Sequence, residues 1–274
     1  MVDEPVHVAH VAAPESSTVA YAHAGRGRPR QQSRLVETFA GADGAAYLVN
    51  AATEVHLDEA AQVDRYKLQR EGADALRRDP RGASRRALPR PLQCRSGAAL
   101  CNGRHRRRAP GGEGGECSLD GLFVLDGRRV GDTHSRVEHA APRRQSYKGV
   151  LDGQSRGVFN GLVVVRPGAQ KTDAWQMNKN LLLSRGALVH STPQLKDLAD
   201  DVKCKHGSTT GQLDPLALFY LRSRGIGEAE ARSLLTWAFA SDLLKSFAVR
   251  RCAPRSSATC SRASPAPRAS EEAR

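Results

Sequence analysis

The chain has 274 residues, enough for one large domain or two small ones with a sizeable core. Its formal net charge of +13 at pH 7 first suggests a nucleic-acid-binding protein. The positions of the charges argue against this class. Residues 77–108 hold 11 arginines and one acid, residues 250–274 hold 6 arginines and 2 glutamates, and the rest of the chain has a net charge of −1.

The first arginine-rich window, within residues 74–112, contains no Val, Ile, Phe, Tyr or Trp, and residues 248–274 are also poor in large apolar side chains. Such segments bury too little apolar surface to offset the entropy lost on ordering, so we predict disorder in both. Arg, Ala, Pro, Gly, Ser and Cys are also the residues that GC-rich DNA encodes out of frame. We therefore interpret both windows as frameshifted strand and helix sequence.

Cysteine usage and the N-terminal sequence indicate the compartment. Of six cysteines, only Cys117 and Cys204 lie outside the two windows. Two separated thiols do not make a disulfide framework, so we expect a reducing environment. The N-terminal sequence has early acids and no long apolar stretch, so it does not resemble a signal peptide. No run approaches the roughly 18 apolar residues of a membrane span. We expect a cytoplasmic protein with no membrane partner.

Short strands are predicted over most of residues 1–213. Residues 1–72 alternate β-rich pieces with small-residue turns, and several pieces show a period of two, as in residues 53–57. After the first window, the turn dipeptides Asp-Gly, Asp-Gly, Pro-Gly and Arg-Gly recur at residues 126, 152, 167 and 185. Intervals of about 15 to 26 residues with one or two strands each are typical of a β-solenoid.

Antiparallel hairpins of a β-sandwich are the alternative on pattern alone. The continuous apolar run at residues 162–165, LVVV, favours parallel strands that are buried on a packed face. We therefore predict a mainly β fold in which residues 1–213 form a solenoid core.

The best chemical lead is the run ADDVKCKHGSTTGQLD at residues 199–214, which contains Cys204 and His206. In an extended segment, residues i and i+2 point to the same face, so the thiol and the imidazole would share one environment. Two ligands leave coordination positions open, which a partner chain or a transient cluster must fill, and these ligand types suit iron–sulfur chemistry or zinc. The alternative is a buried thiol beside a hydrogen-bonded imidazole.

From residue 214 the apolar period becomes helical, and residues 214–247 are predicted to form a C-terminal helical segment. Pro215 at the first turn and Gly225 just past the end delimit a first helix with Leu216, Phe219 and Tyr220 on one face. In a second helix the apolar residues cover more than one narrow stripe. Part of this surface can pack on the first helix, and the rest binds a partner, covers the end of the solenoid, or does both. The candidate partner-binding residues are Leu234, Leu235, Trp237, Phe239, Leu243 and Leu244.

Four long strings resemble the SufD family of iron–sulfur cluster assembly proteins. They are YKGVLDGQSRGVFNG at residues 147–161, QKTDAWQMNKNLLLS at 170–184, DDVKCKHGSTTGQLD at 200–214 and LFYLRSRGI at 218–226. The resemblance runs from about residue 115 to residue 247 and is weaker upstream.

This resemblance implies a right-handed parallel β-helix followed by a small helical segment. It implies a scaffold subunit rather than an enzyme, which pairs with a SufB-like subunit through the β-helix and docks a SufC-like ATPase through the C-terminal helices. Cys204 and His206 stand at the family's Cys-x-His positions, where iron or an iron–sulfur cluster would be held transiently and shared with the partner. The chain itself is expected to bind no nucleotide.

Two other functional classes remain open. An RNA- or DNA-binding protein using the arginine-rich windows would bind weakly and with a steep salt dependence, because the windows lack interleaved aromatic residues. A β-helix enzyme acting on polysaccharide would need a row of acids along one face. His134 and His139, near Asp132 and Glu138, could mimic an acid–base set, but without a nucleophile motif they are interpreted as surface histidines.

Overall fold

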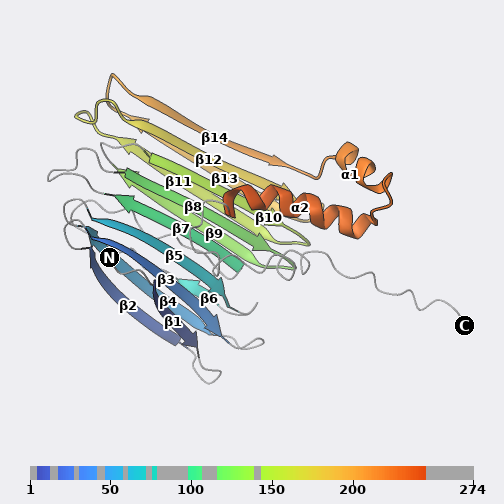
Figure 1. Cartoon of the computed structure of the whole chain (residues 1–274), viewed down its shortest axis with the longest axis horizontal. Coiled ribbons are helices and arrows are strands. Elements are labelled where there is room, and N and C mark those ends of the chain that lie inside the picture. The colour runs from blue at the N-terminus through green and yellow to red at the C-terminus, as the bar shows by residue number, and fades with distance from the viewer. Residues whose placement is uncertain are drawn as a thin grey trace, which may run out of the picture.

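The fold is described from a computed structural model, which describes residues 5–12, 18–27, 31–41, 47–57, 61–71, 76–78, 98–106, 116–138 and 143–244. These ranges contain fourteen strands and two helices (Figure 1). The strands of the N-terminal half are β1 (Val6–Ala12), β2 (Thr18–Gly27), β3 (Gln32–Gly41), β4 (Leu48–Leu57), β5 (Gln62–Arg70), β6 (Leu76–Arg78) and β7 (Ala98–Arg106). Those of the C-terminal half are β8 (Glu116–Leu125), β9 (Val130–Glu138), β10 (Arg143–Leu151), β11 (Arg156–Val165), β12 (Asp173–Leu182), β13 (Leu188–Asp197) and β14 (Lys203–Gly211).

The strands form one large sheet and two small ones. The large sheet has the order β1-β3-β5-β7-β8-β10-β12-β14, and the small sheets have the orders β2-β4-β6 and β13-β11-β9. From β8 to β14, successive strands alternate between the large sheet and a small one, so the chain makes one turn for every two strands. Tyr147 pairs with Asn178, and Asn178 pairs with Ser208, in parallel register. This is the predicted β-solenoid, with about four turns.

Strand β7 differs from the rest because it runs antiparallel to both β5 and β8, whereas the other pairs of described strands are parallel. It lies in the first arginine-rich window, for which composition predicts disorder, and so does β6. The structure thus places two strands in that window; its other residues and the tail at 248–274 lie outside the described residues. Successive turns of a solenoid need parallel strands, so β7 interrupts the winding between β5 and β8.

The Asp-Gly turns hold neighbouring coils in register. Gly127 and Gly153 have φ values of +57° and +65°, a conformation that glycine adopts without strain. The two turns also stack closely. A Cβ atom on Gly153 would lie 3.0 Å from the carbonyl oxygen of Gly127, and that oxygen accepts a hydrogen bond of 2.7 Å from the backbone N–H of Gln154. The turn glycines therefore set how closely the coils approach.

Inside the solenoid, aromatic and aliphatic side chains alternate with polar ones along each strand. Tyr147 of the large sheet packs against Phe159 of the opposed sheet, with 5.0 Å between the ring centroids, and both are fully buried. The intervening space also contains a polar row, in which Gln176 donates to Gln145 at 2.6 Å and Asn180 donates to Asn178 at 2.6 Å. The row continues toward β14, the last strand of the large sheet.

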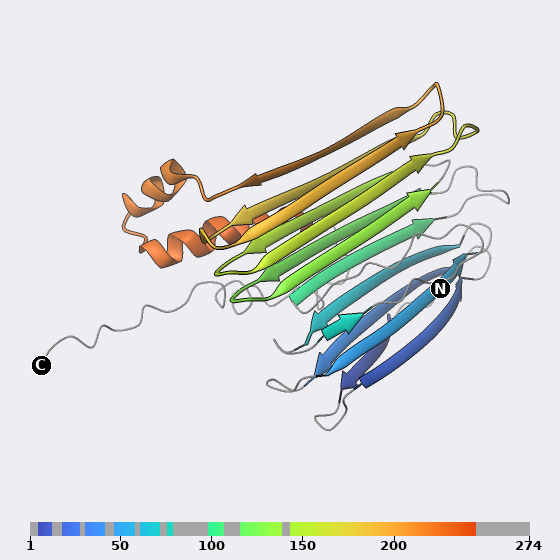
Figure 2. The ribbon, with the colours of Figure 1, turned by 180° about the vertical axis from the view of Figure 1, so that it is seen from behind.

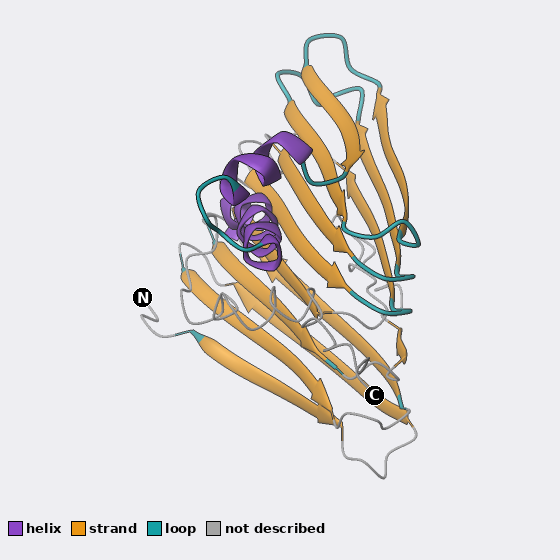
Figure 3. Ribbon diagram, turned by 90° about the vertical axis from the view of Figure 1, so that its right-hand side faces the viewer, coloured by secondary structure: helices purple, strands orange, loops and turns teal. Residues whose placement is uncertain are grey.

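The two helices follow β14 and return to the large sheet. Helix α1 (Pro215–Arg222) begins at Asp214, whose carboxylate accepts a hydrogen bond from the backbone N–H of Leu216, and Pro215 occupies its first turn as predicted. Helix α2 (Glu228–Leu244) lies across the outer face of the large sheet, over β8 and β10 (Figure 3). From behind, the strands lie in front of α2 (Figure 2).

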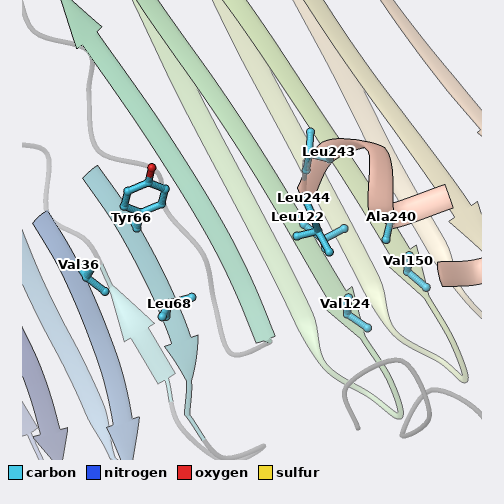
Figure 4. Packing of buried hydrophobic residues seen from close by; sticks show 9 residues of the cluster. All are labelled: Val36, Tyr66, Leu68, Leu122, Val124, Val150, Ala240, Leu243 and Leu244. Atoms are coloured by element: carbon cyan, nitrogen blue, oxygen red, sulfur yellow. The ribbon is translucent and has the colours of Figure 1, made fainter. Parts of the chain in front are cut away.

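Helix α2 completes a core on the outside of the solenoid (Figure 4). Its last two turns add three apolar residues to a cluster of outward-facing residues from four strands of the large sheet, β3, β5, β8 and β10, and they lie over β8 and β10. The buried residues of this cluster are Val36, Tyr66, Leu68, Leu122, Val124, Val150, Ala240, Leu243 and Leu244. Because α2 covers the face of the sheet, it does not cover the end of the solenoid, which was one of the two roles considered for it.

Candidate functional site

Strand β14 carries the two residues singled out from the sequence, and it is an edge strand. It pairs with β12 on one side and stands last in the strand order of the large sheet (Figure 1). Every residue of β14 is exposed or half-buried. An edge strand presents a row of backbone N–H and C=O groups to a partner. The candidate site is therefore at an open end of the solenoid.

Cys204 points toward the interior side of β14. It stands opposite the buried Ala174 of β12 and packs against the apolar cluster that includes Val163 and Val165. Burial raises the pKa of the Cys204 thiol most, and the nearby Asp197 carboxylate raises it further; the hydrogen bond to the Ala174 backbone lowers it by less, and Asp173 adds the smallest increase. Without a bound cation, the thiol is therefore held in its protonated form.

His206 lies on the same face of β14 as Cys204. It stands opposite Gln176, and its Nδ1 atom is 3.2 Å from the carbonyl oxygen of Pro193 in β13. A carbonyl oxygen only accepts, so Nδ1 is the donor of this contact, and Nε2 is the ring nitrogen left to face a ligand. Ser208, two residues further on, hydrogen-bonds at 2.7 Å to Ser191, again on the interior side. The structure thus brings the predicted thiol and imidazole together on one face.

The arrangement offers two side chains of types that bind metals. A neutral imidazole whose Nδ1–H donates to a carbonyl is the form in which histidine binds metals through Nε2. Within the described residues, no group of three or more His, Cys, Asp and Glu side chains could hold a metal ion. Among the described residues, Cys204 and His206 can therefore supply two ligands.

The six predicted partner-binding residues of α2 separate into three environments. Leu234 is 44% exposed, and Leu235 is half-buried. Trp237 and Phe239 are partly buried against the core beneath α2. Leu243 and Leu244 are 2% and 8% exposed and belong to that core. The assignment of Leu243 and Leu244 to a partner surface is wrong, because the chain's own sheet covers them.

A different set of apolar side chains is exposed at the helical end. Leu216, Phe219 and Tyr220 of α1 are 76%, 71% and 54% exposed, and α1 has no buried residue. The sequence indicates that these three residues share a face, but it suggests that the face packs against the second helix. Together with Leu234 of α2 they are the large apolar residues that are exposed in the described helices, and we call these four residues the α1 patch.

Lys148 is a residue that sequence reasoning missed. It lies on β10 beneath α2 and is 8% exposed. Its Nζ atom donates to the carbonyl oxygen of Phe239 at 2.5 Å, pairs with the carboxylate of Asp242 and lies 4.5 Å from the centroid of the Phe239 ring. Arg232 fastens the other end of α2 by donating to the Leu183 carbonyl at 3.0 Å. In the sequence, only the presence of a lysine within the strand YKGVL pointed to this contact between β10 and α2.

His134 and Asp132 are the described members of the possible acid–base set. His134 Nε2 is 2.8 Å from Asp132 Oδ1, and the histidine side chain is 48% exposed. This is a surface pair, as interpreted from the sequence. His139 lies outside the described residues.

Comparison with known proteins tests the resemblance directly. Residues 26–239 match the SUF system FeS cluster assembly, SufBD core domain. The chain belongs to the SufBD family. The match covers β3 to β14, α1 and most of α2, and it confirms the resemblance to SufD proteins.

Several SufBD relatives give the extent of the similarity. A SufBD family protein of Synechocystis is 36% identical over 204 residues, which are 72% of this chain and 45% of the relative. SufD of Escherichia coli is 40% identical over 139 residues, 50% of this chain and 33% of that protein. SufD of Bacillus subtilis is 31% identical over 121 residues, 43% of this chain and 28% of the relative. This SufBD chain thus spans less than half the length of these relatives.

Neither described helix is long and apolar enough to cross a membrane. The cytoplasmic location and the division of the chain into a solenoid, a helical segment and a tail remain predictions.

Proposed function

We propose that this SufBD chain is a non-catalytic scaffold subunit for iron–sulfur cluster assembly, and that β14 is the strand at which iron or a nascent cluster is received. Family membership supports the general role. The observation that carries the specific role is the placement of Cys204 and His206 on one face of an exposed edge strand.

The chemistry of this face suits a transient metal substrate. A protonated thiol binds metal weakly, so the raised pKa of Cys204 keeps the strand empty until a cation arrives and displaces the proton. The Asp197 and Asp173 carboxylates, which raise that pKa, also attract a cation electrostatically. His206 offers Nε2 as the second ligand. Two ligands bind a cluster loosely, which fits a scaffold that must later release it.

The remaining ligands would come from a SufB-like subunit whose own edge strand lies along β14. The exposed backbone groups of β14 favour this mode, since a partner strand can extend the large sheet by main-chain hydrogen bonds. The metal would then lie between the two subunits.

The α1 patch would dock a SufC-like ATPase. Contiguous exposed apolar residues beside a polar rim mark protein interfaces, and Leu216, Phe219 and Tyr220 are exposed on a helix that buries none of its residues. Helix α2 is anchored to β8 and β10, so a displacement of the docked ATPase would reach the large sheet directly.

The test is cluster assembly by complexes that contain single variants. Full-length chain is co-expressed with a SufB-like subunit and a SufC-like ATPase, and the iron and acid-labile sulfide bound per complex are measured after reconstitution. We expect Cys204→Ser and His206→Gln each to lower bound iron by several-fold. The matched controls are Cys117→Ser, a half-buried cysteine of β8, and His190→Gln, an exposed histidine of β13, and these should retain the normal amount. Equal iron in all four variants would remove the ligand role.

A further inference from the structure

The outer face of the large sheet carries a group of exposed cations beyond the area covered by α2. In the register of β10, β12 and β14, Arg144 stands beside Trp175, and Trp175 stands beside Lys205. Lys203 precedes Lys205 by two residues, and Lys179 follows Trp175 by four. These five residues therefore share one face of the sheet, and we call it the basic face.

The cations of the basic face outnumber its acids within the described part of the chain. Lys179, Lys203 and Lys205 are exposed and make no ion pair there. The guanidinium of Arg144 lies 5.4 Å from the centroid of the Trp175 ring, which leaves its charge uncompensated as well. Asp173 of β12 is also exposed and shares this face opposite Lys203, so it offsets one of the four positive charges of Arg144, Lys179, Lys203 and Lys205. The face therefore keeps a net positive charge and is complementary to an anionic partner.

Strand β14 determines which kind of anionic partner fits. Its outer edge offers backbone hydrogen-bonding groups over nine residues, from Lys203 to Gly211. An extended peptide bound at this edge would place alternate side chains on the basic face about 6.6–6.8 Å apart. Lys203 and Lys205 have the same spacing because they are i and i+2 of one strand. Opposite charges in directly facing cross-strand positions stabilise a strand pair, whereas like charges destabilise it.

We propose that the partner strand at β14 is acidic on its outer face, with carboxylates at alternate positions facing Lys203 and Lys205. This inference rests on the proposed strand pairing and specifies its charge. The two faces of β14 thus have separate roles: the inner face supplies Cys204 and His206, and the outer face selects the partner. A nucleic acid fits less well, because Arg144 already covers the only aromatic ring of the basic face and no bare stacking platform remains.

Labelled peptides test this charge selectivity on the full-length chain. One ten-residue probe has Glu at alternate positions and Val or Thr between them, and the matched probe has Gln in place of each Glu. Binding is measured by fluorescence anisotropy at low salt. We expect the Glu peptide to bind roughly 3- to 10-fold more tightly than the Gln peptide, since exposed ion pairs contribute modestly. The double variant K203Q/K205Q should abolish most of this difference.

Lys196→Gln is the matched control, because Lys196 is an exposed lysine on β13 in the opposed sheet. It should leave the preference for the Glu peptide unchanged, which separates the basic face from anion binding by the arginine-rich windows. Circular dichroism confirms that each variant keeps its β structure, and the single variant K205Q should give an intermediate preference.

Two results would overturn the proposal. One is equal binding of the Glu and Gln peptides, or a Glu preference that K203Q/K205Q leaves intact. The other is loss of binding to a 20-residue oligothymidylate in K203Q/K205Q without loss of the Glu preference, which would assign the lysines to nucleic acid. The Cys204→Ser variant distinguishes this inference from the proposed function. Cys204→Ser should bind the Glu peptide normally. If Cys204→Ser also assembles a normal amount of cluster, the proposed ligand role is wrong, but the charge preference for the Glu peptide is unaffected.

Discussion

Replacing Leu243 by Ala should destabilise the chain, whereas replacing Leu234 by Ala should not. Leu243 is 2% exposed and packs with Leu122, Val124 and Val150 on the outer face of the large sheet. Burying a leucine side chain contributes about 1.5–3 kcal/mol, and the cavity left by truncation raises the cost to about 2–5 kcal/mol. Because Leu243 lies in the last turn of α2, which can relax into the space, we expect about 2–3 kcal/mol.

Leu234 provides the comparison on the same helix. It is 44% exposed, so truncation to Ala removes only part of a buried contact and should cost at most about 1 kcal/mol. Because Leu234 belongs to the α1 patch, its loss should instead weaken capture of a SufC-like ATPase. Leu243→Ala should weaken ATPase capture only indirectly, to the extent that it destabilises the packing of α2 on the sheet.

Urea denaturation and hydrogen exchange measure these effects. The fluorescence of Trp237, which lies in α2 against this core, follows the release of the helix, and amide exchange in residues 228–244 gives its local opening free energy. A cost of 2–3 kcal/mol corresponds to about 30- to 150-fold faster exchange through opening. If Leu243→Ala exchanges like the unmodified chain while ATPase capture is lost, Leu243 faces a partner and the packing described for α2 is wrong.

Three further predictions concern ionisable residues. Lys148→Met should destabilise α2 by about 1–3 kcal/mol, because the carbonyl and carboxylate that Lys148 binds lose their donor. Amide exchange in residues 228–244 should become faster. Unchanged exchange would show that Lys148 does not hold α2 on the sheet. Alkylation of Cys204, mapped by mass spectrometry, should require a higher pH than alkylation of an exposed thiol. In Asp197→Asn, the pH at which alkylation is half-maximal should be lower. No change would show that the Asp197 charge does not raise the pKa of the thiol. Burial raises the pKa of Glu37, but Arg65, Thr53 and Lys67 outweigh it and lower the pKa below its usual range. The stabilisation by Glu37 should therefore be complete above about pH 4.3, the unfolded value, and disappear as the pH falls through the folded pKa; Glu37→Gln should abolish this acid-dependent loss in thermal melts, and an unchanged pH profile would refute it.

The arginine-rich window gives a separate test of sequence against fold. The antiparallel β7 lies where the solenoid requires parallel coils, and its residues come from the segment interpreted as frameshifted. Replacing residues 74–112 by the corresponding coils of a SufD relative should raise the thermal midpoint, since a solenoid is stabilised by stacking of neighbouring coils. A lower midpoint would show that the window is native to this fold.

Alternation along a strand explains why the sequence could predict that Cys204 and His206 share one face of β14, while their role as metal ligands stays a prediction. A period of two is a local property, so the common face of Cys204 and His206 follows from their spacing once β14 is extended. The Asp-Gly dipeptides likewise determine their own backbone conformation, and Gly127 and Gly153 have the positive φ that they predict. At the other turns the pattern was less informative, since the left-handed residue after Pro167 is Lys171.

The role of α2 was decided by tertiary structure. The apolar residues of α2 cover more than one stripe of the helix, and the sequence does not say which stripe packs against the large sheet. The strands give no answer either, because their outward residues Leu122, Val124 and Val150 and their inward residues are all apolar. Only the packed chain shows that Leu243 and Leu244 are covered and that the α1 patch is not. The sequence by itself determined the solenoid, its turns and the shared face of β14, because these depend on residues close together in the chain. Which apolar surface remained for a partner depended on contacts between residues nearly a hundred positions apart, such as Lys148 with Asp242, and those contacts exist only in the folded chain.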